Sequence, residues 1–133
     1  MVNKKINLEN KMIEDIGLSK LNIYNDSMKL SNKIWDIVNV LDYFVKDTIG
    51  KQLVRSADSI SANISEGYGR YSFKENIWFL YYSRGSLYET ITWINKATRR
   101  GIIKTDRGNL IEMNLTVLLK MQNAYIKNLK PTL

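Results

Sequence analysis

The chain contains no cysteine, no histidine and only one proline among its 133 residues. Without cysteine it can form no disulfide, thiolate zinc site, iron–sulfur cluster or thiol nucleophile. Without histidine it lacks the commonest general base and the commonest metal ligand. Di-metal sites in helical bundles, which need Glu-x-x-His pairs, are excluded for the same reason. We therefore expect a protein that is not an enzyme and has no catalytic residue, metal or cofactor.

Long apolar runs are also missing from the sequence. No stretch approaches the roughly 20 apolar residues that a transmembrane helix requires. Residues 1–17 lack the apolar run of a signal peptide. With no cysteine and no export signal, we expect a cytoplasmic protein without a membrane partner.

The remaining composition is that of one globular domain, because 44% of the residues are hydrophobic and the length suffices to bury a core. Basic side chains number 20 and acidic ones 13, which gives a formal net charge of +7. A surplus of this sign favours polyanionic partners.

Glycine and proline are sparse, and apolar residues recur every three to four positions, which is typical of helices. We predict four helices, over about residues 20–44, 48–66, 73–100 and 106–129. Their short connections favour antiparallel neighbours, so residues 19–130 are predicted to form an all-α, up-down-up-down four-helix bundle. Residues 1–18 are polar and are expected to be an N-terminal tail, with a short extra helix as the alternative.

Two polar side chains mark expected helix starts. Ser72 and Glu75 have the spacing of a capping box, in which each side chain satisfies a free backbone donor. Thr105 is expected to cap the fourth helix.

The second predicted helix carries two neighbouring stripes. The apolar one is a core face: Ile49, Leu53, Ala57, Ile60 and Ile64. The other is polar: Gln52, Ser56, Ser59, Asn63 and Glu66. The polar stripe is interpreted as a hydrogen-bonded seam between helices, with a polar binding groove as the alternative.

The third predicted helix is apolar on two sides. One arc holds Ile77, Leu80, Tyr81, Leu87, Tyr88, Ile91 and Ile94, and the other holds Trp78, Phe79, Tyr82, Trp93 and Ala97. A helix in a monomeric bundle buries one stripe, so the second stripe implies a second burial partner. We favour self-association through Trp78, Tyr82 and Trp93, with a ligand pocket or another protein as alternatives.

Two glutamates could approach each other as a general acid/base pair. Glu66 and Glu89 occupy the second and third helices. We favour pairing of each with an arginine such as Arg55, Arg70 or Arg84.

The end of the third helix is rich in cations: Lys96, Arg99, Arg100, Lys104 and Arg107. Cations stabilise a helix C-terminus, which explains Arg99 and Arg100 but not Lys104 and Arg107. These five residues are therefore the candidate contacts to nucleic-acid phosphates.

Two segments together resemble a family signature. The first runs over residues 52–72, QLVRSADSISANISEGYGRYS, and the second continues through Glu75 and Phe79-Leu80 to SRGSLYE at residues 83–89. Both are similar to the four-helix S23 ribosomal proteins, also called 23S rRNA intervening-sequence proteins, over roughly residues 20–125. Two serines, Ser65 and Ser83, stand where that pattern commonly has alanine. The matching positions are interpreted as structural: Arg55, Ser59, Asn63, Glu66, Gly67, Arg70, Gly85, Ser86 and Glu89.

The resemblance implies a left-handed bundle that assembles as a ring-like homopentamer. It also implies a relation to accessory proteins of diversity-generating retroelements, which bind nucleic acid and a reverse transcriptase. The expected partners are therefore other copies of the chain, RNA or DNA, and a protein such as a reverse transcriptase.

Overall fold

The computed structural model describes residues 17–130, and within this range the chain forms helices and turns without a strand. The elements in chain order are η1 (Leu18–Lys20), α2 (Asn22–Asn39), α3 (Tyr43–Val45), η2 (Lys46–Gly50), α4 (Lys51–Tyr68), α5 (Phe73–Arg99) and α6 (Thr105–Leu129). The π-helical turn η2 joins α3 to α4 without a gap, so these three elements form one continuous helix.

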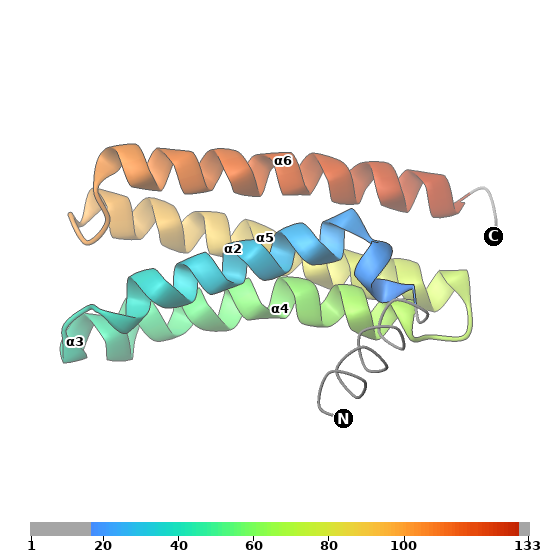
Figure 1. Cartoon of the computed structure of the whole chain (residues 1–133), viewed down its shortest axis with the longest axis horizontal. Coiled ribbons are helices and arrows are strands. Elements are labelled where there is room, and N and C mark those ends of the chain that lie inside the picture. Colours follow the sequence, from blue (N-terminus) through green and yellow to red (C-terminus); the bar gives the residue numbers. More distant parts are fainter. Residues whose placement is uncertain (1–16, 131–133) are drawn as a thin grey trace, which may run out of the picture.

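The four long helices lie along a common axis, and each runs antiparallel to the next in the chain (Figure 1). α2 packs on α4, α4 on α5, α5 on α6, and α6 returns to α2. The turn between α2 and α3 and the turn between α5 and α6 lie at the same end of the bundle (Figure 1). This arrangement confirms the predicted all-α, antiparallel four-helix bundle. Its left-handed sense and its assembly into a ring stay predictions.

The core is made of aliphatic side chains that recur at helical spacing on all four helices. The five residues of the apolar face expected on the second helix are all buried, with exposed fractions of 5% or less. They belong to one core cluster with buried residues of the other helices, among them Ile34, Leu80, Leu87, Ile94, Ile111, Leu115 and Leu118. Burying each such side chain stabilises the fold by about 1.5–3 kcal/mol.

The first helix is shorter than its apolar spacing predicts, because α2 ends at Asn39 rather than near Phe44. The Asp42 carboxylate caps the next helix by accepting a hydrogen bond from the backbone N–H of Val45 at 3.1 Å. Phe44 therefore belongs to the second helix, where its side chain is 75% exposed. No glycine or proline marks this turn and the apolar spacing continues through it, so periodicity alone misses the break.

The two expected helix caps have different outcomes. The Ser72 hydroxyl accepts a hydrogen bond from the backbone N–H of Glu75 at 3.2 Å, which confirms the cap of α5. Thr105 is wrong as a cap, since it is the first residue of α6 and Lys104 takes the N-cap position without a side-chain hydrogen bond.

The N-terminal prediction concerns residues 1–18, of which residues 1–16 lie outside the described part of the chain. The described part begins at Gly17, which has a positive φ of 82° before the short turn η1. A side chain at Gly17 would clash with the Tyr68 hydroxyl at the end of α4.

Candidate functional site

Five cations gather where α5 passes into α6. Gly101 turns the chain with a positive φ of 73°, which glycine adopts without a Cβ clash. The backbone N–H groups of Ile102 and Ile103 bond to the Ala97 carbonyl at 2.9 and 3.3 Å and close the turn. The five predicted phosphate contacts lie on this turn and on the adjoining helix ends, all exposed, and are called the basic patch: Lys96, Arg99, Arg100, Lys104 and Arg107.

The basic patch has five cations and one carboxylate, Asp106, between residues 96 and 107. No member forms an ion pair with any residue between positions 17 and 130. The Lys96 ammonium lies 5.0 Å from the centre of the Trp93 ring, which is a cation–π contact and leaves the positive charge in place. The patch therefore presents charge to solvent.

Helix stability explains only part of the basic patch. Arg99 ends α5 and Arg100 is its C-cap, where a cation complements the helix dipole. Lys104 is the N-cap of α6 and Arg107 lies in its first turn, where a cation opposes the dipole by about 0.3–1 kcal/mol. The dipole of α6 therefore does not explain the charge of these two side chains.

The start of the second helix brings two lysines, Lys46 and Lys51, to the same end of the bundle, where Asp42 and Asp47 offset their charge. Lys46 and Lys51 flank Asp47, whose carboxylate lies 3.1 Å from the Lys51 ammonium. Lys46 forms no ion pair among the described residues.

A hollow with an apolar floor separates the end of α2 from the start of α6. Its volume is about 570 Å³. Its lining residues are Ile37, Val40, Leu41, Ile102, Ile103, Lys104, Asp106, Arg107 and Leu110. Two members of the basic patch, Lys104 and Arg107, thus border exposed apolar surface.

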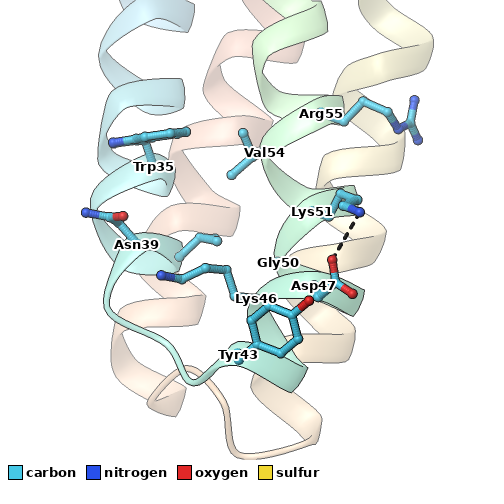
Figure 2. Close-up of a pocket in the computed structure, with 10 residues that line it drawn as sticks. Trp35, Asn39, Tyr43, Lys46, Asp47, Gly50, Lys51, Val54 and Arg55 are labelled. Carbon is cyan, nitrogen blue, oxygen red and sulfur yellow. Dashed lines mark ion pairs between the residues drawn. The ribbon is translucent and has the colours of Figure 1, made fainter.

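The sequence did not predict a second hollow at this end, on the other side of α2 (Figure 2). Its most prominent wall is Trp35, whose side chain is 54% exposed. The available signal is the position of Trp35 between Ile34 and Asp36, on the face of α2 that the core spacing leaves to solvent. The rest of this hollow could not be predicted, because the sequence pattern extends the first helix to about residue 44. That prediction puts Tyr43 in the first helix and Lys46 in a connection.

Glu66 and Glu89 are each paired with an arginine. Glu89 Oε1 lies 2.6 Å from Arg55 Nη2, which joins α5 to α4. Glu66 Oε1 lies 2.6 Å from Arg70 Nη2, and the Arg70 guanidinium stacks over the Phe79 ring at 4.6 Å. Each carboxylate therefore has the partner type that the sequence favours, and they do not form a pair with each other.

The polar stripe of α4 is a seam against α5 at its centre. Buried Ser56 and Thr90 face each other across the two helices, with their hydroxyl oxygens 3.0 Å apart. Ser59 and Asn63 make bonds within the helix: Ser59 Oγ donates to the Arg55 carbonyl and Asn63 Nδ2 donates to the Ser59 carbonyl, both at 2.8 Å. The hydrogen-bonded seam is the correct interpretation at Ser56.

The glycines of the family signature have opposite surroundings. A Cβ at Gly67 would lie 2.8 Å from Phe79 Cβ and 2.8 Å from Asn76 Oδ1, so glycine allows α4 to approach α5 closely. A Cβ at Gly85 would have no neighbour within 4 Å. Beside Gly85, the Ser86 carbonyl accepts a hydrogen bond from Thr90 Oγ1 at 2.8 Å.

The second stripe of α5 divides into exposed and buried halves. Trp78 and Tyr82 are 49% and 60% exposed, as an interface would require. Trp93 is half-buried against the core and Ala97 is only 1% exposed, so their assignment to an outward stripe is wrong. Tyr88, expected on the core side, is 55% exposed. The reason is that α5 packs between α4 and α6, and the buried arc near its C-terminus is wider than one stripe.

Residues 17–130 lack two features of other protein classes. No group of three or more Asp or Glu side chains gathers there as a metal site would require. None of the helices in this range is long and apolar enough to cross a membrane.

Comparison with known families identifies the chain. The pattern of the family described as 23S rRNA-intervening sequence protein matches residues 19–124. The chain belongs to this family. The fold is similar to a solved structure, that of a protein of unknown function from the S23 ribosomal protein family of Bacteroides thetaiotaomicron VPI-5482. The two chains superpose with a TM-score of 0.72 and share 24% sequence identity. The alignment covers 79% of this chain and 98% of that one, and at this identity it supports the fold alone. No curated protein matches the chain.

Proposed function

We propose that this member of the 23S rRNA-intervening sequence protein family is a non-enzymatic, cytoplasmic nucleic-acid-binding protein. The observation that carries the proposal is the basic patch, whose five exposed cations have no ion-pair partner among residues 17–130. Lys104 and Arg107 oppose the dipole of α6, so folding gives no reason for their charge.

The expected mode of binding is contact with phosphates. Exposed lysine and arginine side chains at a helix end can reach backbone oxygens, and such contacts position a nucleic acid without reading its sequence. The family name supports a setting among ribosomal RNA genes without specifying a ligand. RNA and DNA are both compatible with contacts of this kind.

Self-association is the second part of the proposal. Trp78 and Tyr82 leave an aromatic strip exposed on α5, with Gly85 beside them offering open space for another helix. A second copy would cover this strip, and a homopentamer is the expected assembly. Each copy would then contribute one basic patch, and repeated weak contacts would raise the overall affinity.

A second candidate function uses the same aromatic strip. The protein would then be a scaffold or accessory subunit whose α5 face binds another protein, such as a reverse transcriptase. Exposure of Trp78 and Tyr82 in the purified assembly favours this candidate, and their burial between copies favours self-association.

The experiment that tests the proposal is fluorescence-anisotropy binding of labelled RNA and DNA across a salt series, on nuclease-treated protein of known mass. Binding at micromolar concentration or tighter, with a steep negative slope of log affinity against log salt, supports a phosphate site. No binding at low salt overturns it.

A further inference from the structure

The hollow beside Trp35 lies between the end of α2 and the start of the second helix, next to the turn that joins them. Its volume is about 490 Å³. We call it the Trp35 hollow. It is lined by Trp35, Val38, Asn39, Tyr43, Lys46, Asp47, Gly50, Lys51, Val54 and Arg55. Figure 2 shows the Trp35 indole at one end of this hollow and Tyr43 at the other, with Lys46 between them.

A close helix contact forms the floor. A Cβ at Gly50 would lie 2.8 Å from Val38 Cγ1 and 3.1 Å from the Val45 carbonyl oxygen, so η2 meets α2 there only because residue 50 is glycine. The same stretch is a π-helical turn, a distortion that is often found at functional sites. The result is an apolar floor between two helices, held by packing.

Two aromatic rings at the hollow remain uncovered by the chain. Trp35 is 54% exposed and Tyr43 is 80% exposed. Exposed aromatic rings beside an apolar floor are the surface on which single-stranded nucleic acids stack their bases.

The charge of the hollow suits an anion. Its one carboxylate, Asp47, is paired with Lys51 at 3.1 Å. Arg55 points away from the hollow (Figure 2) and is held by Glu89 at 2.6 Å. The Lys46 ammonium forms no ion pair among the described residues. A ligand in the hollow would therefore meet one unpaired positive charge and no unpaired negative charge.

The Trp35 hollow is lined by the end of α2 and by η2, and the basic patch lies around the turn between α5 and α6. Figure 1 shows the turn after α2 and the turn between α5 and α6 at the same end of the bundle. The end of α2 separates them: Val38 and Asn39 line the hollow, and Val40 and Leu41 line the neighbouring one that Lys104 and Arg107 border. A flexible polyanion crossing the end of α2 would therefore meet a stacking surface on one side and several cations on the other.

We infer that the Trp35 hollow binds an unpaired base of single-stranded RNA or DNA, whose backbone phosphates contact Lys46 and the basic patch. This inference rests on the proposed function and adds a preference for single strands. In a duplex both faces of each base are covered by stacking, so only an unpaired base can lie against an indole ring.

The test compares three labelled probes with equal numbers of phosphates across one salt series: a single strand, the same strand with abasic positions, and a duplex half as long. Trp35→Ala is expected to weaken binding of the single strand by roughly 5- to 150-fold, the value of one stacked base. The salt slope should stay unchanged because every cation that binds a phosphate is still present. Binding of the duplex and of the abasic strand should be unaffected.

The matched control is Tyr71→Ala, which removes an even more exposed aromatic ring from the turn between α4 and α5, and Figure 1 shows this turn at the opposite end of the bundle. It should leave all three affinities unchanged. Circular dichroism and the mass of each variant should match those of the parent protein, because Trp35 is largely outside the core.

The outcomes separate this inference from the proposed function. Salt-dependent binding that Trp35→Ala leaves unchanged, or weakens equally for duplex and single strand, overturns the inference alone. Loss of assembled mass in Trp35→Ala would mean that a second copy covers the hollow, which also overturns it. Failure of the parent protein to bind any of the three probes at low salt overturns both.

Discussion

Ser83 and Gln122 are joined by a buried hydrogen bond that links α5 to α6, with Gln122 Nε2 donating to Ser83 Oγ at 2.7 Å. Ser83 Oγ donates in turn to the Ile60 carbonyl on α4 at 2.8 Å. Both polar side chains are 0% exposed. One serine therefore connects three helices through the core.

Replacement of this serine should cost more than the loss of one hydroxyl. Ser83→Ala removes the acceptor of the buried Gln122 amide and should lower the free energy of unfolding by about 1–3 kcal/mol. Urea denaturation followed by circular dichroism measures the change. Adding Gln122→Leu should recover most of the loss, because no polar group is then left without a partner. A double variant no more stable than Ser83→Ala would contradict this account.

Two glycine substitutions should have opposite effects on stability. Gly67→Ala places a Cβ 2.8 Å from Phe79 Cβ and should destabilise the bundle by about 1–3 kcal/mol through overpacking. Gly85→Ala has open space around it and should raise helix stability by up to about 1 kcal/mol. Denaturation at protein concentrations that keep each variant monomeric provides the comparison. Equal effects at the two positions would refute the assignment of Gly67 as the contact point of α4 and α5.

Glu89 should contribute little to the free energy of unfolding. Glu89 pairs with Arg55 at 2.6 Å, but the two side chains remain 36% and 56% exposed. Glu89→Gln should therefore change the free energy of unfolding by at most about 1 kcal/mol. A loss well above this value, measured by the same denaturation, would mean that the pair does more than join two helices.

The aromatic strip of α5 can be tested through the mass of the protein. Trp78→Glu combined with Tyr82→Glu should give a species near the chain mass of 15.5 kDa in light scattering, because charge on this face opposes contact between copies. Helical content should be unchanged, since both side chains are exposed. The matched control is Met113→Glu with Val117→Glu, at exposed apolar positions of α6. A parent protein that is already monomeric, or a double variant that keeps the parent's mass, would refute self-association through α5.

The sequence predicts the helices where apolar spacing and end signals agree. α5 and α6 begin and end within one residue of their expected bounds, since Ser72 and Gly101 mark the ends of α5. The turn near residue 40 could not be found by periodicity, because Leu41 and Phe44 continue the spacing of α2. Asp42 was the local signal, as a capping residue three positions before the Val45 backbone N–H that it binds.

For the candidate site too, the sequence predicts one part, and the other part depends on how the helices pack. Exposure of the basic patch follows from its sequence, because five cations in a segment of twelve residues, Lys96 to Arg107, cannot be buried without partners. The Trp35 hollow could not be predicted, since it depends on how closely η2 packs on α2 at Gly50 and Val38. The burial of Trp93 and Ala97 likewise depends on the position of α6 beside α5.

The most direct test of the central claim is the salt dependence of nucleic-acid binding in a variant that lacks four cations of the basic patch: Arg99→Gln, Arg100→Gln, Lys104→Gln and Arg107→Gln. The matched control removes four exposed lysines elsewhere on α2 and α6, so both variants carry the same formal net charge: Lys29→Gln, Lys33→Gln, Lys120→Gln and Lys127→Gln. The patch variant should bind more weakly, and its log–log salt slope should flatten by about 0.7 on a single strand, or about 0.9 on a duplex, for each phosphate that the protein no longer neutralises. The control should stay close to the parent protein in slope. Equal slopes in the two variants would contradict the assignment of the basic patch as the nucleic-acid interface.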